Sequence, residues 1–472
     1  MTYGLAPGIV IEDSVRGSFL VSARPLRMVR LNPALLKLTQ RMLAAEIEAT
    51  SAAETTVLES LVKSGFVVRH QNLADLAQLP AVSIVIPVKD RAADLRQCLN
   101  SLKELNYPSE ILEVVVVDDG SSDDSPKVAT ELGALLVRSG AVGGGPALAR
   151  NKGASVASGE ILAFIDSDCS ASVDWLADLL PAFNDVSLAA VGGWVAGMFE
   201  GSALDRYEAV MSSLNLGRRE MSGGAGGDTF YLPSCNLLMR KSAFAAAGGF
   251  NPELQVGEDV DLTWRLRDAG WKIQYLPQGT VYHAHRCRTW PFMKRRFDYG
   301  TSEGLLQQLH PVRAKKMLLP PMLTGILLLL VAALATLSLL PLPIAALLLL
   351  SDTALTRQRM SRQGLSLPWG KIIAARIRAV GSLGYYLGYH LLRYYLTPLL
   401  LTSALYPPCG VALLVMFLGV GLVDFRVRKP KMYFPGFCFY YLLEQLSYGS
   451  GVFWGCSKMK NFASYRLTLI KA

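Results

Sequence analysis

The sequence is poor in cysteine, and its cysteines form no recognisable pattern. Seven of them are scattered over 472 residues, and no Cys-Xaa-Xaa-Cys pair occurs. Their odd number and wide spacing argue against a disulfide framework and against a zinc site of the usual ligand spacing. The pattern predicts reduced thiols in a cytosolic compartment.

Two further signals are missing. The N-terminus, Met1 to Val15, has no basic stretch followed by an apolar stretch, so no secretory signal peptide is expected. No internal repeat of about 20–50 residues is found, which argues against a solenoid or a propeller. The length instead predicts two or three domains.

The apolar residues are not evenly distributed. Mean hydropathy is +0.30 and the net charge is +9. Residues 1–310 have a globular mixture, whereas residues 317–430 hold long apolar runs flanked by basic residues. Basic flanks predict association with the inner membrane, with the soluble part facing the cytoplasm, and they leave no reason to expect nucleic acid as a partner. The flanking residues are Arg313, Lys315, Lys316, Arg357, Arg359, Arg362, Lys371, Arg376, Arg378, Arg426, Arg428, Lys429 and Lys431.

The apolar region does not define a number of membrane crossings. Leu318 to Leu340 is a run of 23 residues without a charge, long enough for a bilayer core of about 30 Å. Pro407-Pro408 divides the later run into two pieces that we expect to be too short to span. The basic flanks all prefer one side, which favours hairpins. Residues 431–472 are expected to fold back on the soluble part.

Residues 1–78 read as a small separate domain. Three short strands precede a helix that starts at Asn32-Pro33, and a second helix starts at Ser51 with Glu54 at capping-box spacing. Strands around a helix pair predict a winged-helix-like unit. Its second helix has no Lys or Arg between residues 51 and 62, so protein or peptide binding is the better hypothesis than DNA binding.

Residues 82–310 alternate between apolar strands and helices, which predicts an α/β domain with a mostly parallel, doubly wound sheet. Ligands bind such sheets at the carboxyl ends of the strands. The expected strands are 82–87, 112–117, 134–138 and 161–165, and the expected helices are 92–105, 124–132 and 146–157.

Acidic residues follow two of these strands. Asp166 and Asp168 come directly after the apolar run that ends at Ile165. Two carboxylates at i and i+2 can both reach one hard cation such as Mg²⁺ or Mn²⁺, although an isolated Asp-Xaa-Asp is more often a solvated turn. Asp118 and Asp119 end the strand at 112–117, where they could accept a hydrogen bond from a nucleobase or simply cap the next helix.

A glycine-rich loop follows. Gly143 to Gly145 precede Pro146, and Arg150 lies one turn into the predicted helix. Glycines allow close backbone approach, and an arginine can meet phosphate. The alternative is a flexible loop before an ordinary helix. A second glycine-rich stretch, 223–227, is expected to form a mobile loop near an acceptor site.

A third acidic motif starts another predicted helix. Glu258-Asp259 lies at the first turn, and Asp259 could be an N-cap alone or a general base beside a substrate hydroxyl. Its position at a helix start is expected to lower its pKa. Farther along, His283 and His285 are expected to point to opposite faces of a strand, so that at most one ligates a metal.

In this order, the motifs resemble the family 2 glycosyltransferases of the GT-A fold. The resemblance covers residues 82–290, from Ile86-Pro87-Val88 to Glu258-Asp259. It implies a nucleotide-sugar donor, a divalent metal and inversion at the anomeric carbon. By resemblance, the donor would contact Pro87, Asp118, Asp119, Arg150, Asn151 and Asp166, the metal would be held by Asp166, Asp168 and His283, Asp259 with its neighbour Glu258 would be catalytic, and Gly249, Phe250, Trp264 and Arg265 would lie on the acceptor side.

The order of domains along the whole chain indicates which members of the family this sequence resembles most. No Gln-Xaa-Xaa-Arg-Trp is present, which makes a processive long-chain synthase a weaker hypothesis. A small domain resembling the peptide-binding PqqD-like domains, followed by a family 2 domain and a hydrophobic region, is similar to the mycofactocin-system glycosyltransferases. That likeness implies glucose transfer from UDP-glucose to a peptide-derived redox cofactor. Two alternatives stay open, a lipid-linked or cell-envelope acceptor and a binding module without activity.

Overall fold

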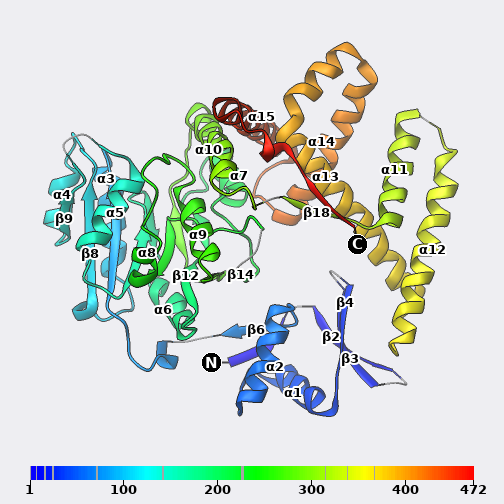
Figure 1. Ribbon diagram of the computed structural model, residues 1–472, viewed down its shortest axis with the longest axis horizontal. Helices are drawn as coiled ribbons and strands as arrows, with labels where there is room; N and C mark the ends of the chain where they lie inside the picture. Colours follow the sequence, from blue (N-terminus) through cyan, green and yellow to red (C-terminus); the bar gives the residue numbers. More distant parts are fainter. Residues whose placement is uncertain are drawn as a thin grey trace.

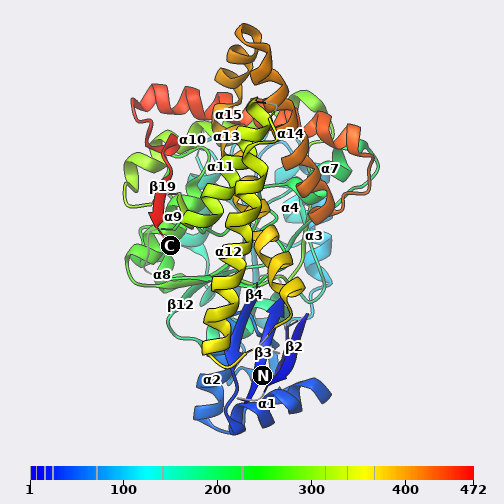
Figure 2. The same ribbon diagram turned by 90° about the vertical axis from the view of Figure 1, so that its right-hand side faces the viewer.

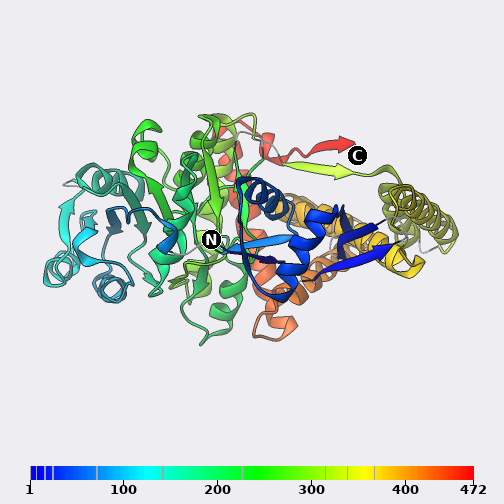
Figure 3. The same cartoon turned by 90° about the horizontal axis from the view of Figure 1, so that it is seen from below.

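The computed structural model describes residues 2–6, 8–14, 17–23, 26–70, 73–140, 143–224, 228–313, 315–336, 338–365 and 367–471. Residues 225–227, within the second glycine-rich stretch, therefore lie outside the described residues. Figure 1 shows an α/β body at one end, a small N-terminal unit below and long C-terminal helices at the other end, and Figures 2 and 3 show the same arrangement from the side and from below.

The N-terminal unit contains two small sheets and a helix pair. One sheet has the order β5-β1-β6 and the other is the meander β2-β3-β4. The predicted strands and both predicted helices are present, while the two short strands β1 and β5 were not predicted. The elements are β1 (Thr2–Leu5), β2 (Ile9–Ser14), β3 (Gly17–Ala23), β4 (Leu26–Arg30), α1 (Pro33–Ala44), β5 (Ile47–Glu48), α2 (Ala52–Lys63) and β6 (Val67–His70).

Helix α2 begins where its capping residues predict. The Ser51 side chain accepts a hydrogen bond from the Glu54 backbone N–H at 3.2 Å. The Glu54 carboxylate accepts from the Thr50 backbone N–H rather than from Ser51, so the box is closed one residue earlier than its usual form. The side chains of both helices and the adjacent strands enclose a separate small core around Leu58.

The central sheet has eight strands in the order β14-β16-β12-β15-β10-β7-β8-β9. Six of them run in the same direction, while β15 and β14 are antiparallel to their neighbours. The sheet is therefore mostly parallel, as predicted, but mixed. Its strands are β7 (Val82–Val88), β8 (Leu112–Asp118), β9 (Leu135–Arg138), β10 (Ile161–Ile165), β12 (Leu188–Gly192), β14 (Met221–Gly223), β15 (Asn236–Arg240) and β16 (Lys272–Tyr275).

Helices cover both faces of this sheet because the strand residues are apolar on both sides. In β7, Ile84 and Ile86 belong to one core and Val85 to the other. The first core takes side chains from α3 (Ala92–Lys103), α4 (Ser125–Glu131) and α6 (Trp175–Leu179); the second takes them from α5 (Pro146–Val156), α8 (Lys241–Ala246) and α9 (Glu258–Asp268).

A second, three-stranded sheet lies beside the carboxyl end of β10. Its order is β11-β17-β13, with β11 (Cys169–Ala171), β13 (Val195–Gly197) and β17 (Val281–His283). Cys169 pairs directly with His283 in the antiparallel β11–β17 ladder. This pairing brings a residue far along the chain to the strand end that carries Asp166 and Asp168.

The C-terminal part is helical. It comprises α10 (Thr289–Leu309), α11 (Pro321–Thr336), α12 (Pro341–Arg362), α13 (Trp369–Leu405), α14 (Pro407–Arg428) and α15 (Phe434–Met459), with α7 (Ala203–Met211) of the α/β body packed against it. The final strand β19 (Thr468–Lys471) pairs in parallel with β18 (Lys316–Leu319), and the two strands lie side by side in Figure 3.

Helices α10 and α15 approach each other at glycines. A side chain at Gly300 would lie 2.3 Å from the Tyr448 carbonyl oxygen, and one at Gly451 would lie 2.1 Å from the Phe297 carbonyl oxygen. Gly304 and Gly455 face each other one turn later. The two backbones are therefore in direct contact, and α10 is held against the C-terminal helix.

The expectation that Leu318 to Leu340 forms one spanning segment is wrong. Strand β18 takes Lys316–Leu319, and the apolar helix α11 is only 16 residues long. The expectation that both pieces around Pro407-Pro408 are too short is also wrong, because α14 starts with Pro407 in its first turn, where proline is tolerated, and continues for 22 residues.

By length and composition, one helix of the described chain is long and apolar enough to cross a membrane. It is α14, whose most apolar window has 22% of its residues buried. Arg393 of α13 donates hydrogen bonds to Glu444 and Gln445 of α15 inside the helical region. The α11–α12 and α13–α14 hairpins point in the same direction, upward in Figures 1 and 2.

Candidate active site

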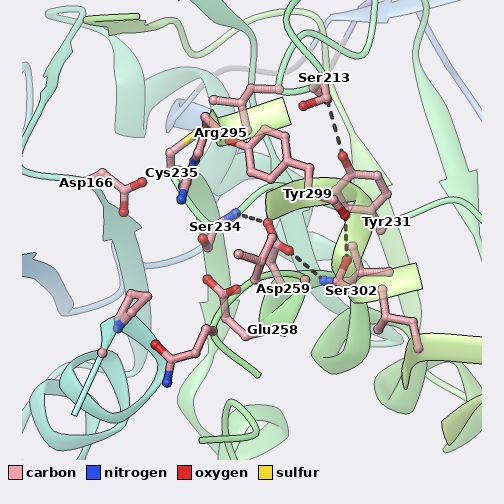
Figure 4. A pocket seen from close by; sticks show the side chains of 18 of the residues that line it. Asp166, Ser213, Tyr231, Ser234, Cys235, Glu258, Asp259, Arg295, Tyr299 and Ser302 are labelled. Atoms are coloured by element: carbon pink, nitrogen blue, oxygen red, sulfur yellow. Dashed lines mark hydrogen bonds between the residues drawn. The ribbon is translucent and has the colours of Figure 1, made fainter. Parts of the chain in front are cut away.

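The carboxyl ends of β7, β8 and β10 open into a cavity of about 720 Å³. Helices α5, α9 and α10 contribute to its walls, and Figure 4 shows Asp259 near its centre, with Asp166 on one side and Ser302 on another. Among the residues expected by resemblance, the cavity brings together some that are up to 196 positions apart. Those that line it are Pro87, Asp119, Arg150, Asp166, Asp168, Glu258, Asp259, Trp264 and His283.

The carboxylate of Asp119 holds the glycine-rich loop. It accepts hydrogen bonds from the backbone N–H groups of Gly144 and Gly145 at 2.8 and 2.9 Å. A side chain at Gly143 would lie 2.4 Å from the Asp119 carbonyl oxygen, so only glycine fits there. Asp118 is buried, and its carboxylate accepts from the Ser121 N–H. Asp119 thus shapes the loop that borders the cavity, while Asp118 stabilises the turn behind it.

Arg150 is a buried bridge between two acids rather than a free phosphate ligand. Its guanidinium donates to Glu258 Oε1 at 2.8 Å and to Asp166 Oδ1 at 2.5 Å. Burial alone would raise the pKa of Asp166, but the charge and hydrogen bond of Arg150 outweigh it and hold that pKa below its usual value. The arginine therefore keeps Asp166 ionised and links the end of β10 to the start of α9.

A cluster of metal-ligand types lies beside Asp166. The ligand atoms of Asp168, Cys169 and His283 lie within 4.8 Å of one another, and Nδ1 of His283 is buried and has no hydrogen-bond partner among the described residues. A carboxylate next to an imidazole whose buried nitrogen is not hydrogen-bonded is a donor set that fits a divalent cation. The expected ligands Asp168 and His283 belong to this cluster, while Asp166 is committed to Arg150 and Cys169 was not expected.

The prediction that His283 and His285 point apart is wrong. Side chains two residues apart on a strand share a face, and the two rings stack with centroids 4.7 Å apart. His285 is nevertheless not part of the metal-ligand cluster, since its Nδ1 faces Glu208 at 4.0 Å. Burial, with the neighbouring positive charges, holds the pKa of His285 well below its usual value.

The Asp259 carboxyl group has a raised pKa, which suits a general base better than a helix cap. Its carboxylate accepts from the backbone N–H groups of Ser234, at 3.1 Å, and Val260, at 2.8 Å (Figure 4). We predicted a lowered pKa from its position in the first turn of α9, and this is wrong. Burial, followed by the negative charge of Glu258, raises the pKa of Asp259 to about 7, outweighing the two hydrogen bonds.

Besides Asp118, four residues expected near the substrates do not line the cavity. Asn151 exchanges two hydrogen bonds with the backbone of Phe250, which is buried against Phe164. Arg265 donates to the carbonyl oxygens of Ala247 and Gly249. Gly249 has φ +72°. These residues fix the turn before α9, so the family motif that contains them maintains the position of Glu258 and Asp259.

The wall opposite Asp166 comes from residues that sequence reasoning missed. Arg295, Tyr299 and Glu303 extend from α10, and Lys315, Arg393 and Tyr448 reach the cavity from farther along the chain. No motif marks them. The only available signal was the basic run Lys294-Arg295-Arg296, which directly follows the last predicted motif.

The far end of the cavity is polar but its charges are paired. Glu303 accepts hydrogen bonds from Lys315 and from the hydroxyl groups of Tyr394 and Tyr448. Arg393 donates to Glu444 and lies over the ring of Tyr448, 3.4 Å from its centroid. Arg313 is paired with Asp268. This end therefore offers aromatic faces and neutralised polar groups.

Comparison with known proteins now identifies the family. Residues 83–247 match the family model described as glycosyl transferase family 2. The glycosyltransferase AglE of Haloferax volcanii is 30% identical over 239 residues, which are 48% of this chain and 73% of that protein. This chain is a family 2 glycosyltransferase. The expected family and its α/β fold are confirmed.

The family 2 glycosyltransferase described here has a likeness that extends beyond the matched domain. It is 29% identical over 468 residues to the pre-mycofactocin glycosyltransferase of Mycobacterium tuberculosis, covering 95% of this chain and 94% of that protein. A solved structure of the mannosyltransferase PcManGT from Pyrobaculum calidifontis, in complex with GDP-Man and Mn²⁺, is 21% identical, with a TM-score of 0.40 over 74% of this chain and 88% of that one.

Proposed function

We propose that this glycosyltransferase moves a hexose, with inversion, from a nucleotide sugar to a hydroxyl group of a small peptide-derived acceptor. The observation that carries the proposal is the position of Asp259, whose raised pKa suits a general base and which lies between the two ends of the cavity. The donor would occupy the end bounded by Asp119 and Asp168, and the acceptor the end bounded by Glu303, Lys315 and Tyr448.

The reaction follows from this arrangement. Asp259 accepts the proton of the acceptor hydroxyl as its oxygen forms a bond to the anomeric carbon. The bond between that carbon and the diphosphate oxygen breaks on the opposite face, and the nucleoside diphosphate leaves with the bonding electrons. A single displacement inverts the configuration, and no residue is required to hold the sugar covalently.

Asp168 and His283, with Asp166 beside them, would hold a divalent cation, Mg²⁺ or Mn²⁺. Such an ion supplies Lewis-acid stabilisation for the charge that develops on the diphosphate. Arg150 neutralises Asp166 and Glu258 without leaving the buried site. It thereby keeps both carboxylates ordered whether or not the donor is bound.

UDP-glucose as donor and a mycofactocin precursor as acceptor are the specific form of the proposal. The likeness to the pre-mycofactocin glycosyltransferase over 95% of this chain supports it. The paired charges at the acceptor end also favour a neutral acceptor over a lipid phosphate, because Lys315 and Arg393 already have carboxylate partners. A lipid-linked or cell-envelope acceptor is the second candidate, which the apolar hairpins favour.

The N-terminal unit would present the peptide-derived acceptor. Support comes from the contact of this unit with the transferase domain. Arg69 of β6 lies 3.1 Å from Glu59 of α2 in the same unit and 3.4 Å from Glu220 of the transferase domain. In the same region Glu220 accepts from Gln274 of the central sheet. A peptide bound to residues 1–78 would then be close to the domain that performs the transfer. The proposal includes the domain limits. They are 1–78 for the N-terminal unit, 82–310 for the transferase domain, 317–430 for the helical region and 431–472 for the tail.

We further propose that the enzyme lies on the cytoplasmic face of the inner membrane, with the two helical hairpins in the lipid. Support comes from their exposed tips: Leu340 is 82% exposed at the α11–α12 tip and Leu405 is 86% exposed at the α13–α14 tip. Basic residues lie at the opposite end of the hairpins, such as Arg359 and Arg428, where they would meet anionic headgroups.

The test is nucleotide release from UDP-glucose, with Mg²⁺ or Mn²⁺ and with a chelator, by wild-type protein and by Asp259→Asn. We expect the substitution to lower the rate by about 10²- to 10⁴-fold, as for loss of a general base. Binding of UDP should stay within about twofold of wild type, because Asp259 does not contact the donor in this proposal. Asp124→Asn is the matched control, since Asp124 is exposed and makes no side-chain cap.

Three results would contradict parts of the proposal. A rate near wild type in Asp259→Asn would remove the base assignment. Activity with another nucleotide sugar but not UDP-glucose would keep the chemistry and remove the mycofactocin form. Transfer to a polyprenyl phosphate, with none to tyrosine-derived amides, would favour the lipid-linked acceptor over the neutral one.

A further inference from the structure

Within the described part of the chain, one arginine that lines the cavity has no carboxylate within ion-pair distance. Arg295 lies near the start of α10, is exposed to the cavity and reaches toward Ser234 and Asp166 in Figure 4. Its guanidinium shares a hydrogen bond with the side chain of Tyr299, one turn later, and the Tyr299 ring centroid is 4.8 Å from the guanidinium carbon. Among the described residues, no carboxylate oxygen lies within 4.0 Å of its nitrogens, whereas such contacts are recorded for the other arginines around Asp166 and Asp168.

Those neighbouring arginines show the contrast. Arg150 is held between Asp166 and Glu258. Arg91 contacts Asp94 at 2.7 Å and Asp168 at 3.5 Å, and Arg286 lies 3.8 Å from Asp168. The two acids that face Arg295 across the cavity, Asp166 and Glu258, are both occupied by Arg150. A guanidinium that has a tyrosine partner but no carboxylate within ion-pair distance is a binding group for an incoming anion.

The location of Arg295 indicates which anion would bind to it. It also borders a small side chamber of the cavity, of about 50 Å³, together with Asp168, His283 and Arg286. The metal-ligand cluster lies on β11 and β17, and Arg295 approaches the same space from α10. A diphosphate between them would be contacted from two sides. A nucleobase or a sugar at this position would leave the arginine without a partner of opposite charge.

We propose that Arg295 binds the diphosphate of the nucleotide sugar and stabilises the nucleoside diphosphate as it leaves. This inference rests on the proposed function. As the bond from the anomeric carbon breaks, its electrons pass to the diphosphate, which gains one negative charge on the oxygen that carried the sugar. The planar guanidinium can donate two hydrogen bonds to adjacent phosphate oxygens, and these strengthen as that charge develops.

This role is supplied from outside the matched family region. Residues 83–247 match the family model, and Arg295 follows that region by almost fifty positions. It is positioned by α10, whose backbone is fixed against α15 through Gly300 and Gly304. The C-terminal helices therefore complete the donor site.

The experiment compares UDP and UMP binding to the full-length protein by calorimetry, in the presence of Mg²⁺ or Mn²⁺. UMP keeps the uridine and the first phosphate but lacks the second. We expect Arg295→Gln to weaken UDP binding by roughly 10- to 100-fold, the value of a charge-assisted hydrogen bond, and UMP binding by about twofold or less. Arg295→Lys should recover part of the affinity, because a single point charge replaces the two-pronged guanidinium.

Lys294→Gln is the matched control. Lys294 is the exposed preceding residue, carries the same charge and does not line the cavity. It should bind UDP and UMP as the wild type does, and the unfolding temperatures of all variants should agree.

Two outcomes separate the proposals. If wild type binds UDP and Arg295→Gln leaves the UDP-to-UMP affinity ratio unchanged, the Arg295 assignment is overturned and the proposed function stands. If wild type binds no nucleoside diphosphate, with GDP and ADP also tried, the proposed function fails and the role of Arg295 fails with it.

Discussion

At the residue scale, the proposed general base is a carboxyl group whose pKa is opposite to what its secondary-structure position predicts. The start of a helix favours an ionised acid, yet burial and the charge of Glu258 raise the pKa of Asp259 to about 7. A base with this pKa is ionised and competent above neutral pH and is protonated and inactive below it. Sequence position alone gave the wrong sign because it contains no information on burial.

A pH profile tests this electrostatic balance. We expect kcat/KM to rise with pH through about 7 and then level off, because Asp259 must lose its proton to act. Glu258→Gln removes the neighbouring negative charge, so the rise should move to lower pH. Steady-state rates between pH 5 and 9 measure both profiles. An identical midpoint in the variant would show that Glu258 does not perturb the base.

At the scale of elements, the contact between α10 and α15 controls the active-site wall. The glycines of both helices let the backbones touch, and α10 carries Arg295, Tyr299 and Glu303 into the cavity. The wall is therefore positioned by a helix that belongs to the C-terminal part of the chain. A local change at this contact should reach the site without altering any residue that touches substrate.

Gly300→Ala tests the contact. The added methyl group would lie 2.3 Å from the Tyr448 carbonyl oxygen, so the helices must separate, at a cost of about 1–3 kcal/mol in the free energy of unfolding. Gly381→Ala is the control, because Gly381 lies within α13 with nothing near its side-chain position, and alanine there should stabilise by about 0.5–1 kcal/mol. Thermal unfolding in the same detergent compares the two. Equal effects would mean that the glycine contact is not tight in solution.

At the scale of the whole molecule, the two helical hairpins are the proposed contact with a membrane. Their apolar tips point in one direction, and the charged pair Asp352–Arg376 lies between the helices rather than on their outer surface. Insertion of both tips from one face would leave the cavity accessible from the aqueous side. The hairpins would serve as an anchor, and no substrate channel through the lipid is required.

Leu340→Asp tests the anchor. A charge at this exposed tip should reduce cosedimentation with vesicles of mixed neutral and anionic phospholipid, since a charged side chain is costly within the bilayer. Val186→Asp is the control, because Val186 is equally exposed, at 82%, but lies on the transferase domain. Binding that is unchanged in Leu340→Asp would exclude the α11–α12 tip from the lipid contact.

The sequence by itself determined the features that depend on local pattern. The strands β7, β8 and β10 and the helices α3, α5 and α9 were predictable, because apolar runs, helical spacing and capping residues act over a few positions. The family followed from Asp118-Asp119, Asp166-Ser167-Asp168 and Glu258-Asp259 at ordered spacings. These motifs could be recognised because each is contiguous.

Only the tertiary structure decided what depends on residues distant in the chain. The insertion of β15 antiparallel to β10, the pairing of Arg150 with Glu258, the stacking of His283 on His285 and the place of Arg295 opposite the metal-ligand cluster all involve contacts that no local pattern encodes. The same holds for the pKa of Asp259. Burial and charge pairing are properties of the folded chain, because they arise from what surrounds a group in space rather than from its neighbours in sequence.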